Sequence, residues 1–440
     1  MILKRKLYKE LIEWKDNKDK ECLLVKGARQ VGKTFLIETF GKENYTSFVE
    51  LNFIFHPELI PVFNGSLEVD DILLRLSAHF RNVAFIPGKT LIFLDEIQRC
   101  PNARTALKSF AIDNRFDVIA SGSLLGLHYG QDPSLEEDIT SVPVGYEKQM
   151  VMHSMDFEEF LWAAGMDIEI IEKMRGYFLN RNKIPEDLNS LFMDYFRKYM
   201  VVGGMPAAVA KFVETKNYAL VHDEQKKILD SYADDINKHA STPEKVKIKK
   251  CFDSIPRQLA KENKKFQYST VESRSNSRKF GSSIDWLNDA AIVHVCSNLS
   301  LPSFPLDAYA MDEYFKAYVH DTGLLVAMYG FEMKRPILDQ TLTGPAKGGI
   351  FENVIADMLV KRGYVLHYFK EGESNYEIEF VISKDASVIP IEVKAKRGAT
   401  VSLNSFIERF EPKVAYKFID GNLGVDGCKV SLPHYMVMFL

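Results

Sequence analysis

Residues Cys22–Glu38 read CLLVKGARQVGKTFLIE and join an apolar, strand-like run to a helical run through a turn with two glycines. Within this stretch, Gly27–Thr34 have the pattern G-x-x-x-x-G-K-T of a phosphate-binding loop. The two glycines let main-chain N–H groups and a helix N-terminus face an oxyanion. An ordinary glycine turn is the alternative, but the strand before the loop and the helix after it favour phosphate binding.

The residue types in this loop predict its ligand. Lys33 is expected to bring its positive charge to the β- and γ-phosphates, and the Thr34 hydroxyl is expected to bind magnesium. ATP and Mg²⁺ are therefore the predicted cofactors. The expected nucleotide-binding residues are Gly27, Ala28, Arg29, Gln30, Val31, Gly32, Lys33, Thr34 and Phe35.

A second apolar run, Leu91–Leu94, ends in Asp95 and Glu96. A buried strand that ends in two carboxylates is costly unless a cation lies at its tip. We expect Asp95 to hold the magnesium ion and Glu96 to polarise the water that attacks the γ-phosphate. Alone, this pattern is also a common strand end. Together with the loop, it predicts a site that hydrolyses ATP as well as binding it.

A third apolar run, Asp117–Ala120, leads into Ser121-Gly122-Ser123. Open parallel sheets bind ligands at the edge formed by the carboxyl ends of their strands. Ser121 or Ser123 is therefore predicted to contact the γ-phosphate or the attacking water as part of the catalytic group. The alternative is a plain Ser-Gly turn.

Taken together, these motifs resemble those of prokaryotic AAA-superfamily ATPases that carry an uncharacterised C-terminal region with a restriction-endonuclease-like end. The resemblance covers nearly the whole chain. The basic residue that often follows a glycine before the last core strand in such proteins is absent, because Tyr146 follows Gly145. The motifs that carry the resemblance are GARQVGKT at 27–34, LDEIQ at 94–98, ASGS at 120–123, DFEEFL at 156–161, VGGMP at 202–206 and DTGLL at 321–325.

The composition is that of an ordinary globular protein. Its 440 residues suggest around three domains at about 150 residues each, and a net charge of −4 requires any nucleic-acid-binding patch to be local. The five cysteines lie far apart without C-x-x-C spacing, which disfavours structural zinc and a disulfide framework. No export signal or apolar run of ~18 residues is recognisable. We therefore expect a cytoplasmic protein without a membrane contact.

Strand-like and helix-like runs alternate up to about Leu161, which is typical of an α/β, doubly wound parallel sheet. The expected architecture has four parts. They are a P-loop AAA-type ATPase domain over 1–165, a helical lid over 166–240, a winged-helix-like basic module over 241–340 and an α/β restriction-endonuclease-like domain over 341–440.

The third part contains a local excess of positive charge. An amphipathic helix is predicted over Asn276–Ala290, with Phe280, Ile284, Leu287 and Ala291 on its apolar side. Such a helix can enter a DNA groove while neighbouring lysines contact phosphates, so segment 245–279 is the predicted DNA contact. The alternative is a solvated face on a structural helical bundle. The eleven basic residues are Lys245, Lys247, Lys249, Lys250, Arg257, Lys261, Lys264, Lys265, Arg274, Arg278 and Lys279.

The last part contains carboxylates and a lysine in a nuclease-like pattern. A period of two places Glu392 and Lys394 on one strand face, and a similar alternation is expected to expose Glu377 and Glu379. With Glu352, Glu379 and Glu392 as metal ligands and Lys394 beside them, this would be a magnesium-dependent nuclease site, as the resemblance also implies. The alternative is a fold that binds DNA without cutting it, since Glu379 stands where that fold usually has Asp.

The sequence therefore predicts an ATP-binding and ATP-hydrolysing switch or motor that is coupled to a C-terminal DNA-binding region. Two alternatives remain open: a signalling ATPase with a protein partner, and an ATP-gated, metal-dependent nuclease. An oligomer is compatible with each of them.

Overall fold

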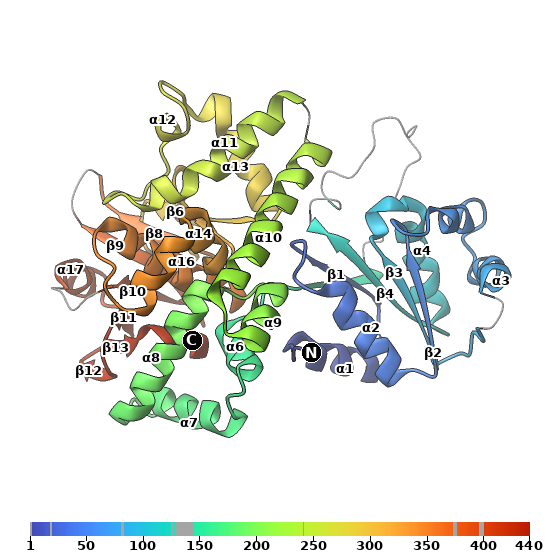
Figure 1. Cartoon of the computed structure of the whole chain (residues 1–440), viewed down its shortest axis with the longest axis horizontal. Coiled ribbons are helices and arrows are strands. Elements are labelled where there is room, and N and C mark those ends of the chain that lie inside the picture. The colour runs from blue at the N-terminus through green and yellow to red at the C-terminus, as the bar shows by residue number, and fades with distance from the viewer. Residues whose placement is uncertain are drawn as a thin grey trace. The chain divides into compact units, whose positions relative to one another are not determined.

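A computed structural model describes residues 2–17, 20–80, 83–124, 127, 145–240, 242–372, 376–395 and 400–440. These residues form two compact units, a first unit over Lys4–His153 and a second unit over Ser154–Leu440 together with the first residues of the chain. Figure 1 draws the first unit mainly in blue and cyan and the second from green to red. None of the helices described is long and apolar enough to span a bilayer.

The first unit is an α/β fold around a parallel sheet, as predicted. Its strand order is β2-β3-β4-β1-β5, and all four neighbouring pairs are parallel. The strands are β1 (Cys22–Gly27), β2 (Ser47–Asn52), β3 (Thr90–Asp95), β4 (Asp117–Ser123) and β5 (Glu147–Val151). The helices are α1 (Leu7–Asp16), α2 (Lys33–Asn44), α3 (Val69–His79) and α4 (Pro101–Asp113), with short 3-10 helices η1 (Pro57–Phe63) and η2 (Ile97–Arg99).

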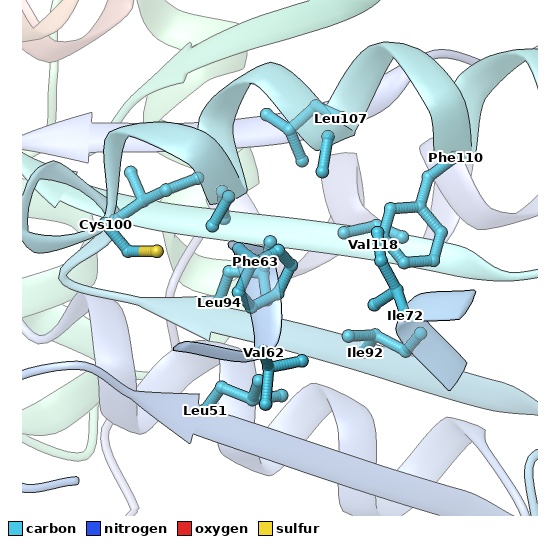
Figure 2. Packing of buried hydrophobic residues seen from close by; sticks show 14 of the residues in the cluster. Leu51, Val62, Phe63, Ile72, Ile92, Leu94, Cys100, Leu107, Phe110 and Val118 are labelled. Atoms are coloured by element: carbon cyan, nitrogen blue, oxygen red, sulfur yellow. The ribbon is translucent and has the colours of Figure 1, made fainter. Parts of the chain in front are cut away.

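The central strands are apolar because they are covered on both faces, as parallel strands generally are. All six residues of β3 are buried. Figure 2 shows how η1, α3 and α4 pack on one face of the sheet: Phe63 and Ile72 meet Leu94 and Ile92 of β3, beside Phe110. This packing holds the carboxyl ends of β1, β3 and β4 at one edge of the sheet.

The second unit combines helices with an eight-stranded mixed sheet of order β12-β13-β11-β10-β9-β8-β6-β7. Its strands are β6 (Val293–Leu299), β7 (Ala310–Val319), β8 (His367–Lys370), β9 (Glu377–Lys384), β10 (Ser387–Val393), β11 (Ala415–Ile419), β12 (Gly424–Asp426) and β13 (Lys429–Pro433). Its helices are α6 (Phe157–Ala163), α7 (Ile168–Leu179), α8 (Glu186–Val202), α9 (Pro206–Thr215), α10 (Tyr218–His239), α11 (Thr242–Leu259), α12 (Tyr268–Val271), α13 (Ser277–Asp289), α14 (Thr322–Tyr329), α15 (Lys334–Leu338), α16 (Pro345–Lys361) and α17 (Val401–Phe410). Short 3-10 helices η3 (Leu306–Tyr309), η4 (Phe331–Met333) and η5 (His434–Phe439) complete it.

This sheet crosses two of the predicted parts of the chain. β6 pairs with β7 in antiparallel orientation and with β8 in parallel orientation, so strands from before and after residue 340 share one hydrogen-bonded sheet. The division between the units lies before α6, because Phe157 of α6 packs on Phe196 of α8 at 5.5 Å between ring centroids. The strands that follow the basic helices in sequence therefore belong to the C-terminal sheet, with β7 at its edge and β6 between β7 and β8.

Two of the later motifs, VGGMP and DTGLL, meet in a buried hydrogen-bonded group. Asp321 is fully buried, accepts from the Gly204 N–H at 2.7 Å and from the Ser154 hydroxyl at 3.2 Å, and caps α14 through the Leu324 N–H. A Cβ at Gly204 would collide with the carbonyl oxygen of Met155, so only glycine fits there. These motifs thus stabilise the packing of the second unit.

The packing in Figure 2 predicts unequal effects for two phenylalanines that lie close in sequence. Phe63 is fully buried and lies edge-to-face with Phe53 at 5.8 Å, whereas Phe55 is 78% exposed. Phe63→Ala is expected to lower the free energy of unfolding of the first unit by about 3–5 kcal/mol, because it leaves a cavity. Phe55→Ala, the control, is expected to change it by less than about 0.5 kcal/mol. Urea unfolding of the full chain measures both, and equal effects would contradict this packing.

Candidate functional site

The phosphate-binding loop lies between β1 and α2, as its sequence predicts. Gly32 has φ 94° and Gln30 has φ 64°, both in the left-handed region that a tight turn around an anion requires. Gly27 ends β1, and a Cβ there would collide with the carbonyl oxygen of Met152. Gly32 thus allows the main chain to turn, and Gly27 allows the chain at Met152 to approach closely.

The predicted loop side chains occupy different environments. Lys33 is 8% exposed, and its ammonium group donates to the carbonyl oxygens of Gly27 at 3.0 Å and Ala28 at 2.8 Å. Val31 is buried, whereas Phe35 is 53% exposed. Of the remaining loop side chains, Ala28 is buried, Arg29 is half-buried and Gln30 is exposed. The loop therefore presents mainly backbone groups and one ammonium group.

Asp95 lies at the tip of β3, is 1% exposed and accepts hydrogen bonds from three other elements. The donors are the Thr34 hydroxyl at 3.0 Å, the Asn52 amide nitrogen at 2.8 Å and the Ser121 hydroxyl. Burial raises the pKa of Asp95, and the hydrogen bonds from Ser121 and Thr34 oppose that rise. The structure therefore brings Thr34, Asp95 and Ser121 together.

Glu96 and Ser123 form an adjacent group that is joined by Gln98. The Gln98 amide nitrogen donates to Glu96 Oε2 at 2.5 Å and to Ser123 Oγ at 3.5 Å. Glu96 itself has φ 56°, a left-handed conformation for a residue other than glycine. Such a conformation is uncommon and turns the chain sharply after β3. Ser121 therefore contacts Asp95, whereas Ser123 is linked through Gln98 to Glu96.

Sequence reasoning missed three residues that order this site. Asn52 ends β2 and is paired in register with Asp95, so a polar residue at the end of the neighbouring strand was a usable signal. Gln98 lies two residues after Glu96, within the LDEIQ motif, so its amide group was a second usable signal. Arg5 donates to the carbonyl oxygens of Val31 at 2.8 Å and His153 at 2.7 Å, and no local pattern indicates such a contact.

These residues fit a magnesium–nucleotide complex. Mg²⁺ prefers oxygen ligands, and the Thr34 hydroxyl and Asp95 carboxylate lie 3.0 Å apart beside the loop. The buried carboxylate receives hydrogen bonds from neutral donors, so it retains an excess of negative charge that a cation would neutralise. The donor types of this set therefore suit a nucleotide site in which Thr34 and Asp95 would hold the metal.

The four residues of the nuclease-like pattern all lie in the second unit. Lys394 contacts Glu379 Oε1 at 3.3 Å and Glu392 Oε1 at 3.1 Å, and the Val393 N–H donates to Glu379 Oε2 at 3.3 Å. Burial raises the pKa of Glu379 to about 7, with Lys394 opposing that rise. Glu392 is 1% exposed, and its Oε2 lacks a hydrogen-bond partner within the described residues.

Glu352 of α16 lies in a different ionic environment. Its two oxygens contact Lys264 at 3.0 Å and Lys316 at 3.4 Å. The predicted exposure of Glu377 and Glu379 is wrong: their side chains are 23% and 12% exposed, because lysines cover them. Across the described ranges, no three His, Cys, Asp or Glu side chains are arranged to hold a metal ion.

Three family models match successive parts of the chain. Residues 19–161 match the AAA domain, residues 193–335 match a domain of unknown function (DUF8612), and residues 347–430 match another domain of unknown function (DUF4143). The first match covers the loop, Asp95, Glu96 and both serines. It supports an AAA-type ATPase in the first unit, whereas the other two matches assign no activity. No curated protein matches this chain.

Several solved structures are similar to large parts of the chain at low identity. A Walker-type ATPase of Pyrococcus abyssi is 12% identical over 74% of this chain and 96% of its own, with a TM-score of 0.43. AMPPCP-bound DnaA from Aquifex aeolicus is 13% identical over 66% and 85%, with a TM-score of 0.31. The Aeropyrum pernix ORC1 protein in complex with DNA is 12% identical over 77% and 93%, with a TM-score of 0.28. Likenesses this weak carry no conclusion about function.

The contact between Asn52 and Asp95 predicts a role in positioning the carboxylate. Asn52→Ala is expected to raise the Mg²⁺ concentration needed for half-maximal nucleotide binding about 10-fold, because groups that orient a ligand tune metal affinity. The control is Asn102→Ala, in the same unit, whose amide contacts Asn64 at 3.5 Å. Titration of Mg²⁺ against a fluorescent nucleotide measures the effect. An unchanged Mg²⁺ midpoint in Asn52→Ala would show that Asp95 needs no such orientation.

Proposed function

We propose that this chain binds and hydrolyses ATP with magnesium in the first unit, and that it couples turnover to DNA bound by basic residues of the second unit. The observation that carries the ATPase part is the buried Asp95 carboxylate, which contacts Thr34 of the loop helix and Ser121 of β4. The phosphate-binding loop, Asp95 at the tip of β3 and the Ser121 hydroxyl all lie within residues 19–161, which match the AAA domain.

The roles in hydrolysis follow from the position of each group. Main-chain N–H groups of the loop and the Lys33 ammonium group would bind the phosphates, and Thr34 with Asp95 would hold magnesium. Bound magnesium would neutralise charge on the phosphates. Glu96, oriented by Gln98 at 2.5 Å, is the group placed to accept a proton from the attacking water. Ser121 would orient the Asp95 carboxylate, and Ser123, which accepts from the Gln98 amide at 3.5 Å, would contact the γ-phosphate or the attacking water.

The DNA part rests on how the basic segment folds. Glu272 forms ion pairs with Lys250 of α11 at 2.8 Å and with Lys279 of α13, so it joins the two helices at their basic residues. The pKa of Glu272 is lowered to about 2 by the hydrogen bonds from these lysines. The neighbouring Arg274 and Arg278 are exposed and form no salt bridge with any residue that the structure describes. Unpaired guanidinium groups beside a braced pair of helices suit phosphate contacts.

The order of elements is also compatible with DNA binding by α13. The helices α11, α12 and α13 precede the antiparallel pair β6–β7, which is the order found in winged-helix modules. Residues Phe280, Ile284 and Leu287 are buried as predicted, and Arg278 lies in the first turn. Ala291 lies beyond the end of the helix with φ 51° and does not belong to its apolar face. β6 also pairs with β8, so any such module is built into the larger sheet.

Two substitutions separate ATP binding from hydrolysis. Lys33→Ala is expected to abolish ATP binding, because it removes the buried positive charge of the loop. Glu96→Gln is expected to keep the affinity for ATP within a few-fold while lowering turnover by about 100-fold or more, because proton transfer is lost. Calorimetry of ATP binding and steady-state phosphate release measure the two effects. Full turnover in Glu96→Gln would remove this residue from the mechanism.

The DNA contact predicts a defined change in salt dependence. The triple variant Lys249→Ala, Arg274→Ala, Arg278→Ala is expected to weaken duplex DNA binding and to reduce the slope of log K against log salt by about 2.7, roughly 0.9 per lost phosphate contact. It should also remove any stimulation of ATP turnover by DNA. The measurement is fluorescence anisotropy with a labelled duplex at several salt concentrations.

A charge-matched control tests whether location matters. Lys183, Lys227 and Arg335 are exposed residues of the same unit that form ion pairs within short sequence distance. Replacing these three residues with alanine removes the same charge and should leave the slope of log K for DNA binding against log salt nearly unchanged. Equal losses of DNA affinity and salt dependence in both triple variants would mean that only net charge matters. Salt-insensitive capture of a protein, with no DNA binding by the unmodified chain, would favour the signalling ATPase instead.

A further inference from the structure

We propose that Lys316 takes the place of a divalent cation among the carboxylates of the second unit, so that this cluster is neutralised by the protein itself. The resemblance implies magnesium near Glu352, Glu379 and Glu392. The surrounding residues do not fit that ion, because ammonium groups contact the oxygens that would bind it. This inference is independent of ATP hydrolysis in the first unit.

Lys316 lies at the centre of the cluster. It comes from β7, its side chain is 1% exposed, and its ammonium nitrogen lies 2.6 Å from Glu377 Oε1 and 3.4 Å from Glu352 Oε2. The Tyr368 ring centroid lies 5.0 Å from the same nitrogen. A buried ammonium group is stable only when anions surround it, and two carboxylates from different elements do so here.

The outer oxygens of the same two carboxylates are also occupied. Lys264 contacts Glu352 Oε1 at 3.0 Å, and Lys370 contacts Glu377 Oε2 at 3.3 Å. The result is a continuous chain of alternating charges from Lys264 to Lys370, with Lys316 in its middle. A metal ion at Glu352 or Glu377 would have to displace an ammonium group first.

The neighbouring pair of carboxylates shares the fourth lysine. Lys394 contacts Glu379 and Glu392, so the four glutamates are matched by four lysines. Mg²⁺ would add two charges to a set that is already balanced, and like charges at these separations repel strongly in a buried site. Glu392 Oε2 is the oxygen left without a hydrogen-bond partner in the described part of this cluster. One such oxygen falls short of a magnesium coordination shell.

These contacts also have a structural consequence. Lys264 and Lys316 precede residue 340, whereas Glu352, Glu377 and Lys370 follow it. The ion pairs therefore join the segment between α11 and α12, and strand β7, to α16 and β9, while β6 pairs with β8 in the same sheet. A lysine ammonium group can join the two segments permanently, because it is covalently part of one of them.

Metal titration of the full chain tests the inference directly. The chain carrying Asp95→Asn, which removes the metal ligand expected in the first unit, is titrated with Mn²⁺ by calorimetry without nucleotide. No Mn²⁺ binding is expected. Binding of Mn²⁺ that disappears in Glu352→Gln or Glu392→Gln would overturn the inference, because it would show a metal centre beside Lys316.

The cation role of Lys316 is tested by removing its charge. Lys316→Met is expected to lower Tm by at least about 5 °C, because two buried carboxylates lose their shared partner. Lys370→Met, the control at the outer oxygen of Glu377, should lower it by less than about 2 °C. If Lys316→Met does not fold, the pair Lys316→Met with Glu377→Gln should restore a folded chain. A Lys316→Met chain as stable as the unmodified protein would sink the proposal.

Discussion

The buried carboxylate of Asp95 is the constraint around which the first unit is organised. A charged group removed from water must receive hydrogen bonds or a cation. Three elements supply one donor each: Thr34 from α2, Asn52 from β2 and Ser121 from β4. Because β2 and β4 flank β3 in a parallel sheet, all of these donors reach the same edge. The loop helix and both neighbouring strands are therefore tied to the Asp95 carboxylate by hydrogen bonds.

The second unit meets the same physical problem with fixed cations. Lysines contact the carboxylates of Glu352, Glu377, Glu379 and Glu392, which is why we infer that this cluster needs no ion from solution. The shifts in pKa follow this arrangement: although burial raises the pKa of Glu377, Lys316 and Lys370 outweigh burial and lower it to about 2. The two kinds of buried carboxylate therefore differ in what they can bind. A carboxylate with neutral donors, such as Asp95, can still take a cation, whereas one surrounded by ammonium groups is already neutralised.

Sequence was sufficient where one short segment both forms the structure and supplies the chemistry. The loop at Gly27–Thr34 and the strand that ends in Asp95 are of this kind, and the parallel sheet that they imply is present. The helix expected over Asn276–Ala290 is α13, because its apolar period alone defines its buried face. Asn52 was missed, since a polar residue at a strand end is only a weak signal until β2 is known to lie beside β3.

The sequence by itself determined the three apolar strands that become β1, β3 and β4 and the phosphate-binding turn, because these depend on contacts within a few residues. It also placed Glu392 and Lys394 on one strand face, because strand periodicity is local. Only the tertiary structure decided which charges surround Glu352 and Glu377. Lys264 and Lys316 reach them from earlier in the chain, through the pairing of β6 with β8, and no local pattern encodes a contact that depends on how distant strands pair.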